Sequence, residues 1–379
     1  MKDLQDIRIE LDEIDRQILA LYERRLALAE DVAVYKEAHR KPVLDKARED
    51  QKLKTLGDMA SDDFSRQGIL ELFEQIMSTS RKKQYRYLAS RGLVENHEFI
   101  CQERFDFSGT RVVYQGLEGA YSQMAMQEFF PGIPEERTFH VKTWRDAMEA
   151  IRLGKADYAV LPIENSSAGV VAENYDLLME YDVAIVGEQI IKIDHALLGV
   201  KGSCISDIRC VYSHPQALMQ CASYLEREHP EFETISLKNT AAAARKVQED
   251  GDRSQAAIAG ARNAKIYDLE VLEEAIQDNK HNETRFIIVS GEKKYLARAD
   301  KISICFELPN EKGSLYHTLS HFIFNGLNMS RIESRPLPGK NWEYRFFVDF
   351  AGNLREEAVQ NALVGLAAET KGLRILGNY

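Results

Sequence analysis

The stretch LALYERRLALAEDVAVYK (residues 19–36) decides how the first part of the chain folds. Apolar residues recur before it and through it at steps of three and four, which predicts one long helix from about residue 3 to 38 with an apolar seam. Position 25 is the one place where the seam is interrupted, and it holds an arginine. The seam consists of Leu4, Ile7, Leu11, Ile14, Ile18, Leu21, Leu28 and Val32.

Arg25 therefore needs an explanation. A lone arginine in an apolar seam can bend its long side chain out to solvent, and it then has no function. Lys36 argues against that interpretation, because it follows 11 residues later on the same face of the helix, about 16 Å along the axis. Two cations on the inward face of one helix indicate an anionic partner.

Two further helices, predicted over about 44–57 and 62–88, show the same anomaly. The apolar stripe of the last helix, Ile69 to Ile76, continues into polar residues four and eight positions on. The middle helix opens with three charged residues that share one face. An interior lined by such groups requires an anionic ligand that forms hydrogen bonds, and a small dicarboxylate meets this requirement. The polar positions are Asp45, Arg48, Glu49, Ser80 and Gln84.

Arg8 adds an inference about assembly. It precedes Arg25 by 17 residues, which is about 25 Å along a straight helix. The two side chains cannot reach one small ligand from the same helix. If both serve one site, Arg8 comes from a second protomer, so we expect a homodimer or a higher homo-oligomer with the long helices paired.

These residues resemble the pattern of the all-helical chorismate mutase family across residues 4–88. The resemblance implies an intertwined helical dimer that converts chorismate to prephenate by a pericyclic rearrangement with no covalent step. It implies that Arg8 and Arg25 clamp the two substrate carboxylates, and that Lys36 and Gln84 donate to the ether oxygen. It completes the site with Glu49 as acceptor from the ring hydroxyl and with Asp45, Arg48 and Ser80 around it.

Residues 108–291 follow a different pattern, in which short β-rich runs alternate with helical stretches. This alternation predicts a mostly parallel α/β fold. The run VAIVGEQIIKIDHALLGV (residues 183–200) could cross between two lobes. Polar motifs border several strand ends, where α/β clefts bind ligands. The motif-rich stretches are YQGLEGAYSQ (114–123), VLPIENSSAGVV (160–171), YSHPQALMQC (212–221), KNTAAAA (238–244) and NETRF (282–286).

Each stretch alone also has a plain structural interpretation. The glycines at 116 and 119 lack the spacing of a dinucleotide-binding loop. Ser213 and His214 suggest a nucleophile and a base, but neighbouring side chains on a strand point to opposite faces and no nucleophile elbow is present. A single buried histidine such as His214 is more often a hydrogen-bonded core residue than a catalytic base.

Together, in this order, the stretches resemble the prephenate dehydratase family over residues 110–290. The resemblance implies two α/β lobes around a cleft, as in type II periplasmic binding proteins, and loss of water and carbon dioxide from prephenate. It assigns Thr284 as the hydrogen-bond donor that helps hydroxide leave as water. Arg285 is a candidate for a substrate carboxylate or equally for support of the loop. The resemblance assigns substrate binding to Glu164, Asn165, Ser213, His214 and Gln220.

The segment 299–379 predicts the order strand, helix, strand, strand, helix, strand, which is typical of a small ferredoxin-like α+β unit. It resembles the ACT regulatory domain of prephenate dehydratases. That resemblance implies a phenylalanine site at a domain-pair interface, although Tyr316 replaces a valine of the family motif and changes the pocket volume. A plain oligomerisation module is the alternative. The implied allosteric residues are Gly313, Ser314, Leu315, Glu333, Ser334, Arg335 and Pro336.

The whole chain of 379 residues resembles the bifunctional chorismate mutase–prephenate dehydratases in its three-domain order. We expect domains at 1–90, 108–291 and 299–379, with a linker over about 89–107. Chorismate and prephenate are then the substrates, L-phenylalanine is the effector, and neither reaction requires a metal or an organic cofactor.

Bulk composition narrows the partners further. The net charge of −11 argues against nucleic acid or an anionic membrane surface as a partner. The five cysteines form no C-x-x-C pair, and the charged start of the chain has no apolar signal region, so we expect reduced thiols and a cytoplasmic protein.

Two other functions are compatible with the residues. One is a non-catalytic amino-acid sensor made of a binding cleft and a regulatory domain, against which the inward-facing Arg25, Lys36 and Gln84 argue. The other is an enzyme that acts on arogenate, the amino-acid analogue of prephenate.

Overall fold

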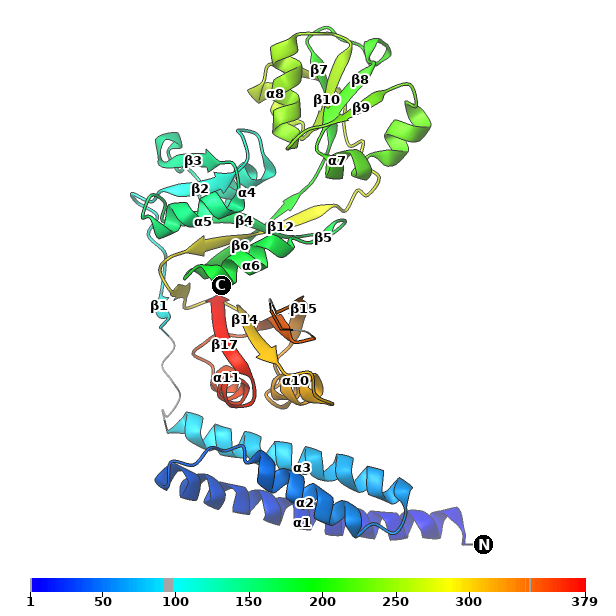
Figure 1. Cartoon of the computed structure of the whole chain (residues 1–379), viewed down its shortest axis with the longest axis vertical. Helices are drawn as coiled ribbons and strands as arrows, with labels where there is room; N and C mark the ends of the chain where they lie inside the picture. The colour runs from blue at the N-terminus through cyan, green and yellow to red at the C-terminus, as the bar shows by residue number, and fades with distance from the viewer. Residues whose placement is uncertain (1, 92–97, 338, 341) are drawn as a thin grey trace. The chain divides into compact units, whose positions relative to one another are not determined.

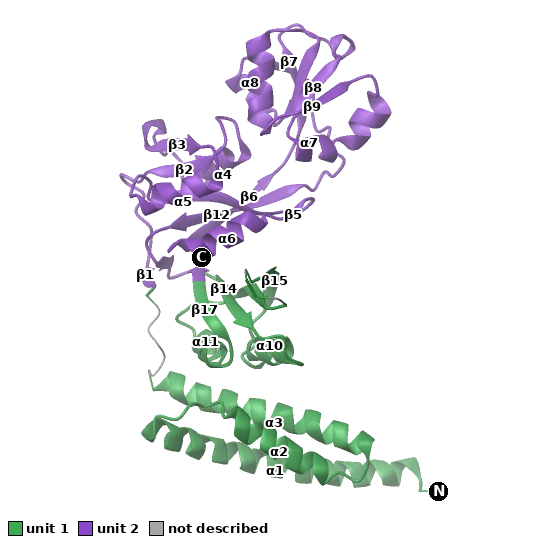
Figure 2. Ribbon diagram, in the orientation of Figure 1, with its two compact units in different colours: residues 1–98, 299–375 green, residues 99–298, 376–379 purple. Residues whose placement is uncertain are grey.

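The computed structural model describes residues 2–91, 98–337, 339–340 and 342–379, which form two compact units (Figures 1 and 2). Unit 1 consists of residues 1–98 and 299–375, and unit 2 consists of residues 99–298 and 376–379. The predicted helical segment and the predicted C-terminal segment therefore lie in the same unit, with the middle segment inserted between them in the sequence.

The helical part of unit 1 consists of α1 (Leu4–Ala38), α2 (Lys46–Asp58) and α3 (Asp63–Ser90), so the predicted all-α segment is confirmed. Each helix begins at an aspartate whose carboxylate accepts a hydrogen bond from a backbone N–H of the first turn, an arrangement that stabilises helix starts. The apolar seam of α1 is largely exposed in the single chain, since Ile14 is 51% and Ile18 55% accessible.

The C-terminal part of unit 1 follows the predicted order of strands and helices. Its sheet has the order β15-β16-β14-β17, and α10 and α11 pack against each other. Phe306, Phe322 and Phe350 are fully buried and form its core. The elements are β14 (Lys301–Leu308), α10 (Ser314–Phe324), β15 (Met329–Pro336), β16 (Tyr344–Ala351), α11 (Glu357–Glu369) and β17 (Lys371–Asn378), of which the part from residue 376 on belongs to unit 2.

Helix α3 connects the two parts of unit 1, because it packs against α1 and α2 and also against α10 and α11. Its residues from Met77 to Tyr85 are therefore mostly buried although many of them are polar. An amphipathic helix with a single buried face would leave half of these side chains in water.

The first lobe of unit 2 contains strands in the order β6-β12-β4-β2-β3, with the short β5 beside β4. Helices α4, α5 and α6 pack on these strands. The elements are β2 (Val112–Gln115), α4 (Tyr121–Phe129), β3 (Thr138–Val141), α5 (Trp144–Arg152), β4 (Tyr158–Asn165), β5 (Gly169–Val170), α6 (Ala172–Glu180), β6 (Ala184–Lys192) and β12 (Glu283–Ser290).

The second lobe has a sheet in the order β11-β7-β10-β8-β9. The helical stretch that follows β8 is broken, because α7 ends at Gln220 and a π-helical turn occupies Tyr224–Glu228. The elements are β7 (Ala196–Val200), β8 (Cys210–Ser213), α7 (Pro215–Gln220), β9 (Glu233–Ser236), α8 (Thr240–Asp250), β10 (Gln255–Ala259), α9 (Arg262–Ile266) and β11 (Leu269–Glu273).

The two-lobed α/β architecture is confirmed, and the predicted crossing over 183–200 is the passage from β6 to β7. The prediction of mostly parallel sheets is wrong. Strand β12 is antiparallel to both β4 and β6, and β7 is antiparallel to both β10 and β11. The reason is that β6 leaves the first lobe and β12 returns to it, so the two crossing strands run in opposite directions.

The predicted linker over 89–107 is only partly irregular. Residues 89 and 90 belong to α3, residues 92–97 lie outside the described part of the chain, and β1 (Ile100–Gln102) pairs in parallel with β13 (Lys294–Leu296). Among the described residues, no helix is long and apolar enough to cross a membrane.

Two candidate active sites

A cavity of about 400 Å³ opens between the three helices of unit 1. Helix α1 contributes Arg25 and Lys36, and α2 and α3 contribute the remaining polar residues. The structure thus brings together seven of the eight residues that the sequence assigned to the first site. They are Arg25, Lys36, Asp45, Arg48, Glu49, Ser80 and Gln84.

Arg25 points into this cavity and is held by α3. Its Nη1 donates to the carbonyl oxygen of Ile76 at 3.3 Å and to the hydroxyl of Ser80. Partial burial lowers the pKa of Arg25, and the nearby Tyr22 only partly offsets this. Among the described residues, no carboxylate makes a hydrogen bond with this partly desolvated guanidinium. The site therefore favours an anionic ligand.

Lys36 and Asp45 are held where α1 and α2 meet. Lys36 Nζ donates to the carbonyl oxygen of Val43 at 2.5 Å, and burial lowers the pKa of this lysine although Asp45 and Glu49 oppose the shift. Asp45 caps α2, since its carboxylate accepts from the backbone N–H of Arg48 at 3.1 Å. Asp45 therefore has a structural task in addition to lining the cavity.

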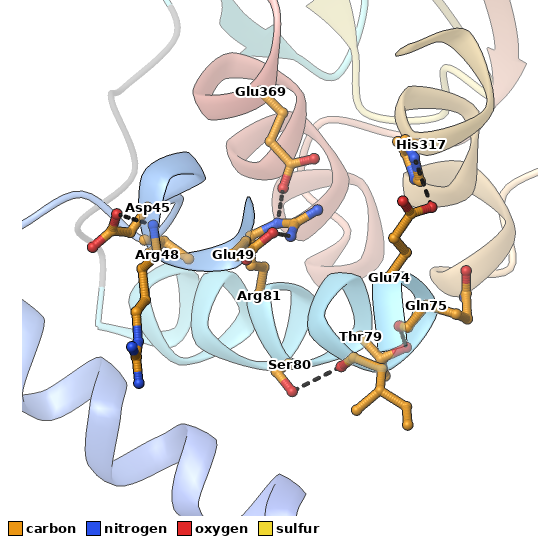
Figure 3. Close-up of polar contacts among 12 residues, drawn as sticks. Asp45, Arg48, Glu49, Glu74, Gln75, Thr79, Ser80, Arg81, His317 and Glu369 are labelled. Carbon is orange, nitrogen blue, oxygen red and sulfur yellow. Dashed lines mark hydrogen bonds and ion pairs between the residues drawn. The ribbon is translucent and has the colours of Figure 1, made fainter. Parts of the chain in front are cut away.

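Two cations of this cavity escaped the sequence analysis, namely Lys52 and Arg81. Lys52 could have been found, because it lies three residues after Glu49 on the same face of α2. Arg81 Nη1 lies 2.5 Å from Glu49 Oε2 (Figure 3). With five cations and two carboxylates in its lining, the cavity is net positive.

Arg8 is exposed and does not line the cavity of this chain. This placement agrees with the distance argument, by which a single helix cannot supply both arginines to one small ligand.

A second cavity, of about 420 Å³, lies between the lobes of unit 2. It is lined by four residues that the sequence assigned to the second site: Asn165, His214, Gln220 and Thr284. Asn165 is at the end of β4, Thr284 is on β12, and His214 and Gln220 bracket α7.

Thr284 and Asn165 form the centre of this site. Thr284 pairs with Asn165 across the strands, and Asn165 Nδ2 donates to Thr284 Oγ1 at 2.9 Å. The amide orientation is fixed, because Asn165 Oδ1 accepts from the backbone N–H groups of Ser167 and Ala168. Since Thr284 Oγ1 is an acceptor in this bond, its own hydrogen remains available for a ligand in the cavity.

The structure adds a buried histidine that the sequence analysis missed. His195 Nε2 lies 2.9 Å from Gln220 Oε1, and its Nδ1 lies 3.3 Å from the hydroxyl of Tyr121. Burial lowers the pKa of His195, which keeps the ring neutral. Gln220 Nε2 in turn donates to Asn165 Oδ1 at 3.5 Å. A chain of hydrogen bonds therefore runs from His195 through Gln220 and Asn165 to Thr284.

His214 lines the cavity as the cap of α7. Its Nδ1 accepts from the backbone N–H of Gln216 at 3.2 Å, and burial lowers its pKa. A neutral ring that accepts at Nδ1 carries its hydrogen on Nε2 and can donate it to a ligand. Ser213 is fully buried and donates to the carbonyl oxygen of Ile258 at 2.6 Å, away from the cavity lining.

Arg285 and Glu164 also lie outside the lining of the second cavity. They pair across β12 and β4 one residue beyond Thr284 and Asn165, and alternation along a strand turns them to the opposite face. Arg285 donates to Glu188 and to the hydroxyl of Tyr379, each at 2.7 Å. This geometry fits the supporting role that the sequence left open for Arg285.

The beginning of α8 also faces the second cavity, through Lys238, Asn239 and Thr240. Asn239 caps this helix and accepts from the backbone N–H of Ala242 at 2.7 Å. A helix N-terminus beside a lysine is suited to a carboxylate. The stretch KNTAAAA was recognised in the sequence, but the individual residues were not selected, because alanines and a cap are also typical of an ordinary helix start.

Neither cavity offers a metal centre, since no group of three or more His, Cys, Asp or Glu side chains in the described part of the chain is placed to hold an ion.

Comparisons with known proteins match two different families to separate parts of the chain. Residues 7–85 match the family model of chorismate mutase type II, and residues 112–294 match that of prephenate dehydratase. The chain thus combines an isomerase and a lyase. A bifunctional chorismate mutase/prephenate dehydratase of Aquifex aeolicus is 33% identical over 380 residues, which cover all of this chain and 98% of that protein. The chain belongs to the bifunctional chorismate mutase/prephenate dehydratase family.

Two further relatives concern the second site. An arogenate dehydratase/prephenate dehydratase of Arabidopsis thaliana is 39% identical over 291 residues, covering 72% of this chain and 73% of that protein. The structure of prephenate dehydratase from Arthrobacter aurescens in complex with L-Phe has 32% sequence identity and a TM-score of 0.64, and covers 71% of this chain and 89% of that one.

Proposed function

We propose that the helical cavity of unit 1 rearranges chorismate to prephenate, that the cleft of unit 2 converts prephenate to phenylpyruvate, and that L-phenylalanine inhibits the enzyme through residues 299–379. The observation that carries the proposal is the convergence of seven predicted residues from three helices on one net-positive cavity. Positive charge there suits a dicarboxylate.

The rearrangement breaks a C–O bond while a C–C bond forms, and negative charge develops on the ether oxygen. No nucleophile is required, so the site has to hold the substrate in a compact conformation and stabilise that charge. Arg25 binds one carboxylate with its partly desolvated guanidinium. Lys36 and Gln84 donate to the ether oxygen, and Glu49 accepts from the ring hydroxyl. Arg48 and Ser80 complete the polar lining.

The first site is complete only in a homodimer, because Arg8 comes from a second copy of the chain. The exposed seam of α1 supports this assembly, since a row of large apolar side chains in water is unfavourable. Pairing of two α1 helices covers the seam and brings Arg8 of one chain towards Arg25 of the other.

Replacement of Ile14 by aspartate is expected to dissociate the dimer, because it puts a charge into the apolar seam. Chorismate mutase activity should fall about 100-fold with the loss of Arg8 from the partner. Sedimentation velocity and both enzyme assays test this. The control is Arg16→Asp, on the outer face of the same turn, which should leave assembly unchanged. A mutase that stays fully active as a monomer would contradict the proposed role of Arg8.

In the second site, Thr284 donates its hydroxyl hydrogen to the departing hydroxyl group of prephenate, which leaves as water, while the C–CO2 bond breaks and its electron pair makes the ring aromatic. A proton from solvent restores the threonine hydroxyl, so the reaction as a whole takes up one proton. A threonine is a weak acid, so the donation accompanies C–O cleavage and does not precede it. The start of α8 with Lys238 provides a site for a carboxylate of the substrate. His214 donates from Nε2 to a further substrate oxygen.

Prephenate and arogenate differ only in a keto or an amino group on the side chain. A keto acid is favoured here, because the described lining of the second cavity contains Lys238 as its charged side chain and no carboxylate that would pair with an ammonium group. Arogenate turnover exceeding prephenate turnover in a parallel assay would reverse this assignment.

Residues 299–379 act as an ACT regulatory domain. Gly313 has a left-handed backbone (φ +79°) at the start of α10, and Glu333, Ser334, Arg335 and Pro336 are on β15, an edge strand of the observed sheet. An edge strand can meet the same strand of a second copy. L-phenylalanine is the proposed effector at that junction, where Ser314 and Leu315 begin α10.

Incubation of the purified chain with chorismate, with and without phenylalanine, tests the proposed function. Chorismate should disappear, phenylpyruvate should form, and phenylalanine should suppress its formation. Tyr316 is 62% exposed beside the proposed effector site, so Tyr316→Val should lower the inhibitory phenylalanine concentration without changing the uninhibited rates. No loss of chorismate would overturn the first site. Accumulation of prephenate would overturn the second, and insensitivity to phenylalanine would overturn the regulatory role.

A further inference from the structure

Arg81 is a buried cation between two carboxylates that come from opposite ends of the chain (Figure 3). Its side chain is 8% exposed, its Nη1 lies 2.5 Å from Glu49 Oε2, and its Nε lies 2.7 Å from Glu369 Oε1. Glu49 belongs to α2 and lines the mutase cavity, whereas Glu369 is the last residue of α11.

Glu369 is itself firmly held. Its side chain is 9% exposed, its Oε2 lies 3.2 Å from His321 Nε2, and its Oε1 also accepts from the hydroxyl of Tyr85 at 3.3 Å. Burial alone would raise the pKa of this carboxyl, but the neighbouring His321 and the charge of Arg81 outweigh burial and lower the pKa to about 2. Glu369 is therefore a fixed anion at neutral pH.

Arg81 uses different nitrogens for its two carboxylate partners, and this determines which oxygen of Glu49 it engages. Arg81 uses Nε for Glu369 and approaches Glu49 through Nη1 on a single oxygen, Oε2. Among the described residues, no hydrogen bond to Glu49 Oε1 accompanies this contact, so that oxygen can face a ligand in the cavity. A guanidinium that is not anchored at Nε tends to bind a carboxylate with two parallel hydrogen bonds. Such a bidentate pair would withdraw both oxygens of Glu49 from the substrate.

We propose that Glu369 is a positioning residue of the mutase site: it anchors Arg81 so that Arg81 orients the Glu49 carboxylate and leaves one of its oxygens to the ring hydroxyl of chorismate. The C-terminal segment thus completes the first active site in addition to any regulatory task. This inference rests on the proposed role of Glu49 in that site.

Replacement of Glu369 by leucine in the full chain should lower kcat/KM of the mutase about tenfold, because small displacements of a catalytic group have effects of this size or larger. Glu369→Gln keeps an oxygen that can accept from Arg81 Nε, so it should retain most of the activity. Dehydratase activity of the same preparation and thermal unfolding report on folding.

Two control variants weaken the contacts of α3 with α10 and α11 but leave the contacts of Glu49 unchanged. Arg86→Gln removes the exposed pair with Glu357, and Ser320→Ala removes the buried hydrogen bond from Lys82 at 2.8 Å. Both should leave mutase kcat/KM unchanged. Should Glu369→Leu not fold, Arg81→Lys keeps the inference testable, because a lysine cannot hold two carboxylates in the same fork geometry, and the same loss of kcat/KM is expected.

Combination with Glu49→Gln separates positioning from general damage. If Glu369 acts through Glu49, the effect of Glu369→Leu should vanish in the Glu49→Gln background. An equal, additive loss in both backgrounds, or a loss as large in the two control variants, would overturn the inference. Full activity of Glu49→Gln alone would instead refute the proposed role of Glu49, so the two failures are distinguishable.

Discussion

Replacement of Arg25 by alanine is expected to lower the mutase kcat/KM by about 1,000-fold, which is the order of effect seen when one partner of a buried charge pair is truncated. The dehydratase should keep its activity, because Thr284 and its neighbours belong to the other compact unit. The physical reason is that partial burial already lowers the pKa of Arg25, so we expect a substrate carboxylate to be the ionic partner that stabilises its charge.

Neighbouring positions provide sharp controls for this result. Arg24 precedes Arg25 on α1 but is exposed, so Arg24→Ala should leave both activities unchanged. Arg25→Lys retains the charge and loses the planar fork, and should give an intermediate loss. Steady-state assays with chorismate and with prephenate as separate substrates provide the measurement. Loss of both activities in Arg25→Ala would contradict two independent sites.

The second large effect is expected from Thr284. Thr284→Val replaces the hydroxyl by a methyl group of similar size, and should lower kcat of the dehydratase by about 100- to 10,000-fold, the range typical of a lost proton donor. The mutase should be unaffected, so this variant should convert chorismate to prephenate and stop there. Thr284→Ser retains the hydroxyl and should recover much of the rate.

The hydrogen bond from Asn165 gives this experiment a second readout. Thr284→Val removes the acceptor of that bond, so some loss of stability is also expected. Thermal unfolding of the Val and Ser variants separates this loss from the catalytic one. A Val variant that folds normally and still forms phenylpyruvate at the parental rate would show that Thr284 is not the donor.

Much of the first site could be predicted from the sequence, because a helix converts spacing into direction. Arg25 and Lys36 share a face by periodicity alone, and the polar residues that follow Ile76 continue an apolar stripe. The absence of Arg8 from the cavity follows from helix rise in the same way. These inferences need only local geometry, and the observed helix α1 begins and ends close to the predicted positions.

The second site was harder to predict, because strands obtain their neighbours from distant parts of the sequence. Local alternation indicates that Thr284 and Arg285 face opposite ways, but it cannot tell which face borders the cavity. The antiparallel position of β12 and the approach of His195 to Gln220 depend on the return of the chain between lobes. Arg81 and Glu369 are 288 positions apart, so their contact has no local signal.

The insertion of unit 2 between the two halves of unit 1 has a consequence for the order of folding during synthesis. Helix α3 ends at Ser90, whereas α10 and α11 begin at Ser314 and Glu357. At ordinary rates of translation, roughly 10 to 50 s pass between these events. Throughout that time, the face of α3 that carries Arg81, Lys82 and Tyr85 lacks its packing partners α10 and α11 and is exposed to water. Charged side chains keep the nascent helix from aggregating, which an apolar face of the same area would promote.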